Sequence, residues 1–310
     1  MAQNPFNPLN QTCWNCTDIQ TGTSEDYSST THVLSKESMV VLSVISAFAS
    51  LIGSIGNALV LLAVLKNETL RTIPDLFITS LAFSDFTVCA LFLPMSIYHL
   101  HHPDAKDENM SFYLAKIFLG HTSMVASATN MFAVTVDRVF AIRFPFKYIA
   151  TMTTAHALVE IAVVWIISLT FGALYTRQLI SSLHIAFYSV ILLFSTMIMY
   201  VYIFVTAKRQ ENRIQDITRI SDGSAVEKKV AKTIFTVVGI YAICWLPTLL
   251  LPAVVNPSSK PIEFRRGFFW VQTLLACNSA LNPFIYCMRN HKYRSAFSKI
   301  LRIKRFSDRP

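Results

Sequence analysis

Charged residues are scarce in this chain of 310 residues, and this scarcity is the first guide to its class. Asp, Glu, Lys and Arg together make up 15% of the sequence, whereas soluble domains carry about a quarter. Hydrophobic residues reach 53%, and the polar stretches between apolar runs are too short for a separate soluble domain. The composition therefore excludes a soluble protein and predicts a chain that lies largely within a membrane.

Seven apolar runs are long enough to cross a bilayer as helices. They cover residues 39–65, 73–98, 112–136, 155–174, 179–205, 230–255 and 268–287. In the third run, Lys116 and Arg138 lie at opposite ends, and a helix between them rises roughly 33 Å, about the thickness of the hydrocarbon core. We therefore expect an all-α membrane protein, with a seven-helix transmembrane domain over residues 39–288.

Basic residues are distributed unevenly between the two ends of these helices. Of the 27 Lys and Arg, seven fall on the side of the N-terminus: Lys36, Lys106, Lys116, Arg177, Lys260, Arg265 and Arg266. The other 20 (27 − 7) fall on the opposite side, which the positive-inside rule makes cytoplasmic. We expect a multi-pass plasma-membrane protein with an extracellular N-terminus, and its basic charge gives no reason to expect nucleic-acid binding.

The two ends of the chain carry different signals. Residues 1–38 form a polar extracellular tail with glycosylation sequons at Asn10 and Asn15, where Cys13 and Cys16 can form a local disulfide or stay free. No cleavable signal peptide is evident, so the first apolar helix is expected to start insertion. Residues 289–310 place apolar side chains at helical spacing among basic ones, which predicts an amphipathic helix on the inner leaflet and a short tail.

Polar residues within the apolar runs mark candidate sites. Asp85 lies near mid-membrane depth, where a carboxylate is usually functional, although a neutral, hydrogen-bonded packing residue is the alternative. Pro247 in the sixth run and Pro283 in the seventh are expected to kink their helices. Two kinked helices with polar residues beside them are suited to movement.

Together these features resemble the rhodopsin-like (class A) G-protein-coupled receptors over residues 40–305. Six motifs, each short but together specific, occur in order on separate runs: Asn57; Leu81 with Asp85; Asp137-Arg138-Val139; Trp165, expected to pack against the second helix; Cys244-Trp245-Leu246-Pro247; and Asn282-Pro283-Phe284-Ile285-Tyr286. The resemblance implies a receptor that transmits an extracellular ligand signal to a heterotrimeric G protein.

The resemblance also implies a switch at the cytoplasmic face. Arg138 would pair with Asp137 and with Glu227 at the foot of helix six in the inactive state, although Glu227 could instead be a solvated loop charge. On activation helix six would swing outward. The remaining switch residues are Phe146 as a G-protein contact, Tyr200 and Tyr286 as new neighbours of Arg138, and Trp245, Pro247, Asn282 and Pro283 in the moving helices.

A second cluster implied by the resemblance is a sodium site. It comprises Asp85, Ser127, Asn278, Ser279 and Asn282, whose oxygen atoms suit a hard cation. A sodium ion is therefore expected as an allosteric ligand, and no other cofactor is expected.

Several departures from the family pattern bear on the ligand. Gly120 replaces the aspartate of amine receptors, Ala276 replaces the retinal lysine of opsins, and Tyr113 replaces the usual disulfide cysteine. Leu192 replaces the helix-five proline, and about ten residues are expected between helices four and five. These features resemble the melanocortin receptors and their lipid-binding relatives.

Other parts of the chain leave the ligand open. The motifs of helices six and seven look more like those of adenosine receptors, but Pro252 and Ala276 replace the expected pocket residues. Lys116 occupies the position of a cannabinoid-receptor lysine and a lysophospholipid-receptor arginine, or is only a lysine that extends to the membrane interface. A lipid-like ligand or a short peptide is favoured over an amine, with an adenosine-like nucleoside as the alternative.

The expected ligand contacts follow from helix phase in the outer half. They are Lys116, Gly120, His121, Met124, His184, Tyr188, Trp245, Thr248, Leu249, Phe269 and Gln272. The two histidines could sense pH, but are more simply read as hydrogen-bonded pocket or packing residues.

Three other classes of protein remain to be weighed. An ion-binding transporter that uses Asp85 should show inverted repeats, and the two halves of the chain show no self-similarity. A non-signalling or constitutive seven-helix protein is disfavoured by the intact Asp137, Arg138 and Tyr286. An enzyme is disfavoured because no nucleophile–base pair or metal-ligand spacing occurs.

Overall fold

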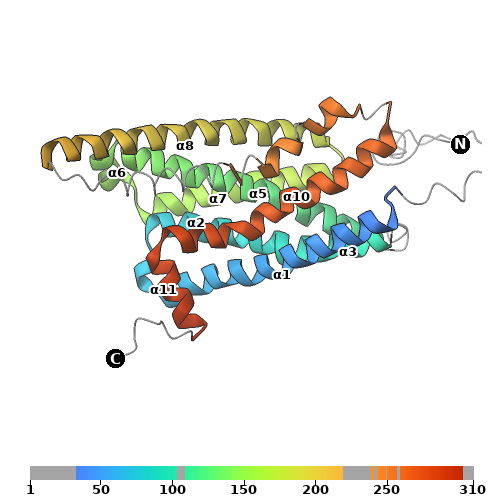
Figure 1. Cartoon of the computed structure of the whole chain (residues 1–310), viewed down its shortest axis with the longest axis horizontal. Coiled ribbons are helices and arrows are strands. Elements are labelled where there is room, and N and C mark those ends of the chain that lie inside the picture. Colours follow the sequence, from blue (N-terminus) through green and yellow to red (C-terminus); the bar gives the residue numbers. More distant parts are fainter. Residues whose placement is uncertain are drawn as a thin grey trace, which may run out of the picture.

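The computed structural model describes residues 33–102, 109–218, 239–240, 243–248, 250–256 and 259–302, and the described elements are helices (Figure 1). Their bounds are α1 Lys36–Lys66, η1 Glu68–Leu70, α2 Ile73–Thr87, η2 Val88–Phe92, α3 Leu93–His101, α5 Met110–Arg143, α6 Pro145–Thr151, α7 Thr154–Thr176, α8 Ser182–Thr218, α10 Pro261–Arg289 and α11 His291–Ile300.

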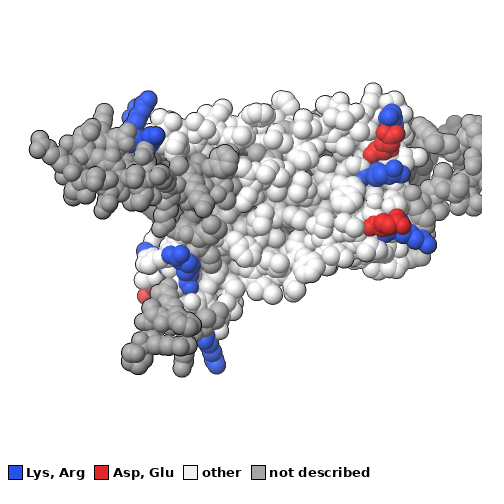
Figure 2. All heavy atoms as spheres, viewed as in Figure 1, with Lys and Arg blue, Asp and Glu red and all other residues white. Residues whose placement is uncertain are grey.

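Five segments of the described part of the chain are long and apolar enough to span a membrane: α1, the continuous α2–η2–α3, α5, α7 and the first part of α8. Large apolar side chains on them face outward, as Phe48 and Ile198 do at 63% and 69% exposure. Figure 2 shows charged side chains at the two ends of the molecule and none in the broad band between them on this face. This distribution fits helices surrounded by lipid.

The long helix α5 lies at the centre of the bundle, against α2, α7 and α8, while α1 packs against α2 and α10 (Figure 1). Trp165 on α7 donates from its indole Nε1 to Ser80 Oγ on α2 at 3.0 Å, and its ring packs edge-on against Phe83. The predicted contact between Trp165 and the second helix is therefore confirmed.

The helix ends differ from those expected from hydropathy. Helix α8 continues to Thr218 and α10 begins at Pro261, because hydropathy marks the part of a helix that lies in lipid and not the whole helix. The expectation of about ten residues between helices four and five is wrong, since only 177–181 connect α7 to α8. Gln178, with φ 60°, reverses the chain there in the left-handed conformation that often ends a helix.

The second transmembrane segment contains a π-helical turn, η2, in which the Leu93 N–H reaches back to the Val88 carbonyl. Pro94 follows at the start of α3. Since proline has no N–H and its ring crowds the carbonyl four residues earlier, it explains the widened turn. This turn places Phe92 where it is almost fully buried, with 2% exposure.

Helix α11 follows α10 and turns away from its axis at the C-terminal end of the bundle (Figure 1). Its buried face consists of Tyr293, Ala296 and Phe297, which pack against Val60, Ala63 and Val64 of α1. Leu301 caps the end of this helix and is 49% exposed. The packed face fixes α11 against the inner end of the bundle.

Candidate functional site

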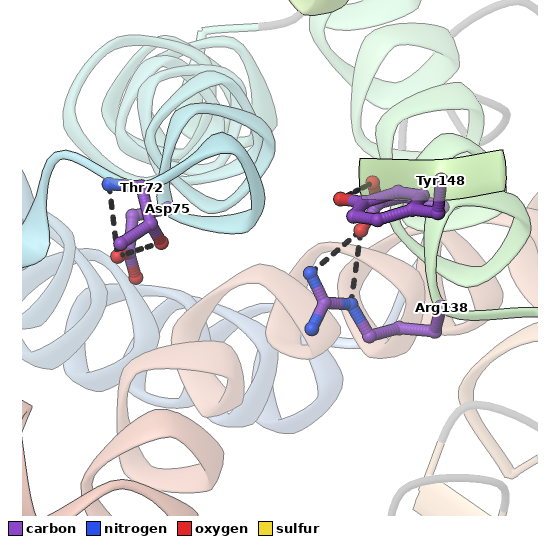
Figure 3. Close-up of polar contacts among 5 residues, drawn as sticks. Thr72, Asp75, Arg138 and Tyr148 are labelled. Atoms are coloured by element: carbon purple, nitrogen blue, oxygen red, sulfur yellow. Dashed lines mark hydrogen bonds and ion pairs between the residues drawn. The ribbon is translucent and has the colours of Figure 1, made fainter. Parts of the chain in front are cut away.

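An ionic group lies at the inner end of α5 (Figure 3). Arg138 donates to Asp137 Oδ2 from Nε at 3.0 Å and from Nη2 at 2.6 Å. Tyr148 of α6 donates its hydroxyl to the other oxygen, Oδ1, at 2.7 Å. The Asp137 side chain is buried at 1% exposure, whereas that of Arg138 is 41% exposed. The carboxylate is thus held by two partners, while the Arg138 side chain stays partly exposed.

Tyr148 was not predicted from the sequence as a partner of Asp137. The only indication in the sequence is an aromatic residue 11 positions after Asp137. Burial, together with the hydrogen bond and negative charge of Asp137, raises the pKa of the Tyr148 hydroxyl. This hydroxyl therefore remains protonated and donates at physiological pH. Nearby on α6, Phe146 is 88% exposed.

A related polar group joins α2 to α11. Asp75 accepts from Thr72 Oγ1 at 2.5 Å and from Tyr293 OH at 3.0 Å (Figure 3 shows Thr72 and Asp75). Thr72 and Asp75 also form the capping box that begins α2. Tyr293 is fully buried, and burial with the nearby Asp75 carboxylate raises the pKa of its hydroxyl. One carboxylate therefore both starts α2 and holds α11 in place.

The mid-membrane cluster is centred on Asp85, which is fully buried. Ser127 of α5 donates to its Oδ1 at 2.7 Å, and Asn282 of α10 donates from Nδ2 to its Oδ2 at 2.6 Å. The side chain of Ser279 also lies near Asp85. These contacts join α2, α5 and α10 through a single carboxylate.

The surroundings of Asp85 have the chemistry of a site for a hard monovalent cation. Ser127, Ser279 and Asn282 are buried and supply hydroxyl or amide oxygens beside the one carboxylate, and Asn278, on the same helix as Ser279 and Asn282, is also buried. Asn57 donates to the carbonyl oxygen of Ser279 at 3.0 Å, and its own Oδ1 has no hydrogen-bond partner among the described residues. Where the chain is described, no three His, Cys, Asp or Glu side chains gather, so the residues fit sodium better than a transition metal.

The other expected switch residues have different surroundings. Tyr200 and Trp245 are buried in one core cluster with Leu81, Ala128 and Leu193, and Pro247 is half-buried. The backbone of Tyr286 belongs to α10, but its side chain lies outside the described part of the structure. Glu227, the glycosylation sites Asn10 and Asn15, and Cys13 and Cys16 also lie outside the described residues.

Of the expected ligand contacts, Lys116, Phe269 and Gln272 line one cavity in the outer half, with a volume of about 30 Å³. Its other polar lining residues are Ser46, Ser96 and Thr273, and its apolar lining comprises Leu42, Phe92, Leu93, Ile97, Leu100 and Phe269. The cavity thus lies among α1, η2, α3, α5 and α10.

The other expected contacts lie elsewhere. His121 stacks on Tyr175 of α7, with ring centroids 3.8 Å apart, and Tyr188 bonds Thr129 on α5. His184 is exposed and hydrogen-bonds Ser181 at the start of α8. The remaining three are placed as follows: Met124 packs near Phe92, Thr248 is half-buried, and Leu249 lies outside the described residues.

Gly120 has a packing role that the sequence did not reveal. A Cβ atom at this position would collide with the ring of Phe92, which η2 holds beside α5. The space that a larger side chain would need is therefore filled by an aromatic ring. Pro94, inside the second apolar run, was the available signal for this arrangement.

These features define a multi-pass helical membrane protein, and comparison with known proteins gives its family. Residues 56–178 and 174–286 match the family described as 7 transmembrane receptor (rhodopsin family), so this chain belongs to the rhodopsin family of seven-transmembrane receptors. The predictions of a class A G-protein-coupled receptor and of a seven-helix membrane fold are thereby confirmed. This is a family of receptors and not of enzymes, and it implies a G protein and an extracellular ligand.

Individual relatives are distant. The chain is 29% identical to human melanocortin receptor 3 over 79% of this chain and 80% of the relative. It is 27% identical to the dog histamine H2 receptor over 86% of this chain and 80% of the relative. Mouse cannabinoid receptor 2 is 26% identical over 85% of this chain and 82% of the relative. The names of these relatives refer to chemically different ligands.

Proposed function

We propose that this receptor, at the plasma membrane, passes an extracellular signal to a heterotrimeric G protein when helix six moves away from α5. The observation that carries the proposal is the Asp137–Arg138–Tyr148 group at the inner end of α5. An ion pair with one half-exposed partner contributes little net stability, so a modest change in free energy can release Arg138. The pair then acts as a latch that ligand binding can open.

Several residues would take part in this movement. Arg138 would turn toward Tyr200 and Tyr286, while Glu227 would lose its contact as helix six bends at Pro247. The exposed Phe146 would contact the G protein. A rigid-body movement of this kind opens a cytoplasmic cleft without unfolding any helix.

The Asp85 cluster supports a second part of the proposal, that sodium biases the receptor toward one state. Asp85 joins α2, α5 and α10 through neutral hydrogen-bonding partners, and no salt bridge to it occurs within the described ranges. A bound cation would compensate its charge and favour the conformation in which these helices stay together.

For the ligand, we favour a lipid-like molecule or a short peptide over an amine. Although the histamine H2 receptor is among the relatives, the collision between a side chain at Gly120 and Phe92 leaves no room for an ammonium-binding aspartate. Relatives named for melanocortin and cannabinoid fit the preferred classes better. We further propose that Asn10 and Asn15 carry glycans on the extracellular tail.

The test replaces Arg138 by alanine and measures nucleotide exchange on a panel of G proteins, first without ligand and then with lipids, nucleosides and short peptides. Arg138→Ala should remove coupling while surface expression persists, because the released guanidinium is needed at the open cleft. Arg143→Ala is the matched control, since it removes an exposed arginine at the end of the same helix, beside Phe144. Undiminished coupling in Arg138→Ala would contradict the proposal.

A further inference from the structure

The cavity in the outer half is lined by a cation that has no acidic partner among the described residues. Lys116 of α5 is the only charged residue among the described residues that line it. Its Nζ lies 5.7 Å from the centre of the Tyr113 ring, and it forms no salt bridge with a described residue. A lysine that merely extends to the interface would not need to line a cavity between α1, α3 and α10.

The other polar group that stands out in this cavity is Ser96. Its Oγ is buried and has no hydrogen-bond partner in the described part of the chain. A buried hydroxyl without a partner is unfavourable, and a ligand oxygen in the cavity would provide one. Lys116 and Ser96 therefore offer an ammonium and a hydroxyl donor to the same space.

The size and charge of the cavity limit what it can hold. Its volume of about 30 Å³ corresponds to roughly two water molecules, which matches a head group of a few atoms but not a whole ligand. One lysine compensates one negative charge, as on a carboxylate, whereas a phosphate monoester carries between one and two. The rest of the ligand must extend out of the cavity, past its apolar lining residues such as Leu100 and Phe269.

We propose that this cavity binds the head group of a carboxylate amphiphile, with Lys116 as its counter-ion and Ser96 as a second donor, while the hydrocarbon part extends out of the cavity past its apolar lining. A carboxylate amphiphile would then be the ligand class of the receptor, which rests on the proposed function only in that binding is assumed to lead to signalling. An amine is excluded as the ligand because the positive charge of Lys116 would repel its ammonium group. The Phe92 ring fills the space beside Gly120, next to the cavity.

The experiment measures the unfolding temperature of the full-length receptor in neutral phosphatidylcholine nanodiscs with decanoate, decyl phosphate, decanol or decylamine. Decanoate should raise the unfolding temperature of the wild type more than the other three probes do. Lys116→Gln should weaken decanoate binding about 10- to 100-fold, as expected for loss of a charged hydrogen-bond donor, and Lys116→Arg should restore part of it. Ser96→Ala should weaken it by a smaller factor.

Lys36→Gln is the matched control, because Lys36 is an exposed lysine at the outer end of α1, and it should bind decanoate like the wild type. The unfolding temperature of each variant is first compared with that of the wild type without ligand. If Lys116→Gln does not fold, decanoate binding by Lys116→Arg and Ser96→Ala still tests the proposal. Equal stabilisation by decylamine or decyl phosphate, or unchanged decanoate binding in Lys116→Gln, would overturn the proposal. The binding assay contains no G protein, so it tests the site alone. If decanoate binds but does not promote nucleotide exchange in the separate G-protein assay, the proposed function is contradicted and the site is not.

Discussion

Polar side chains in the inner half of this receptor have protein hydrogen-bond partners, whereas two in the outer half have none among the described residues. At the inner end, Asp137 is bonded by Arg138 and Tyr148, and Asp75 is bonded by Thr72 and Tyr293. In the outer cavity, neither Lys116 nor the Ser96 hydroxyl has a comparable partner among the described residues. Polar groups that satisfy one another hold a conformation, whereas a cation and a hydroxyl left facing a cavity are available to a ligand.

Asp85 lies between these two halves in the bundle, and its polar group is also satisfied to an intermediate degree. Its carboxylate is bonded by neutral groups, so its hydrogen bonds are satisfied while its charge is not compensated by a described cation. The difference between partnered and unpartnered polar side chains therefore predicts effects of mutation in the outer half, at mid-membrane depth and at the inner end.

The largest effect is expected from adding an unpartnered charge in the outer half. Gly120→Asp should destabilise the receptor by at least about 3 kcal/mol, because the new side chain collides with Phe92 and its charge is buried. Surface expression and the unfolding temperature measure this loss. Combining it with Phe92→Ala should recover part of the stability, because that change removes the colliding ring. A stable Gly120→Asp receptor would show that Phe92 does not restrict this position.

A smaller effect is expected at mid-membrane depth from Asp85→Asn. With sodium at ten times its Kd, linkage predicts about 1.4 kcal/mol of stabilisation for the wild type and none for the variant. The measurement is the unfolding temperature in sodium compared with that in the bulky cation N-methyl-D-glucamine at equal ionic strength. A sodium effect of the same size in Asp85→Asn would place the ion elsewhere.

The smallest effects are expected from removing single hydroxyl partners at the inner end. Tyr293→Phe and Tyr148→Phe should each destabilise the receptor by about 1 kcal/mol, because each carboxylate keeps its other partner. Their functional effects should differ. Tyr148→Phe should raise basal nucleotide exchange by loosening the Arg138 latch, whereas Tyr293→Phe should act mainly on stability. Equal basal exchange in both variants would indicate that Tyr148 has no part in the switch.

The same pair of tyrosines gives a pH dependence. Both hydroxyls have a pKa raised above the usual 10.0, so the folded state keeps these protons while the unfolded state loses them. Their contribution to stability is therefore complete below about pH 10 and declines as the pH rises above that value. Each Phe variant should show a shallower loss of stability above pH 10 than the wild type, as measured by thermal unfolding.

Much of this architecture could be predicted from the sequence because lipid imposes a simple rule on long segments. A chain that crosses a bilayer must satisfy its backbone hydrogen bonds within each helix, so apolar length alone identifies the spanning segments. The resemblance to the rhodopsin-like receptors also allowed Asp85, Ser127 and Asn282 to be grouped before their contacts were known. The five-residue connection after α7 could not be judged in this way, because its turn depends on the conformation of Gln178.

The sequence by itself determined the family, the membrane-spanning character and the candidates for the switch and sodium residues, because apolar runs and short motifs are properties of the chain alone. Only the tertiary structure decided that Phe92 fills the space beside Gly120, that Tyr148 and Tyr293 bond carboxylates on α5 and α2, and that Lys116 and Ser96 share a cavity. These arrangements depend on how helices rotate and pack against one another. A one-residue change in helix phase, such as the π-turn η2 introduces, redirects every side chain that follows.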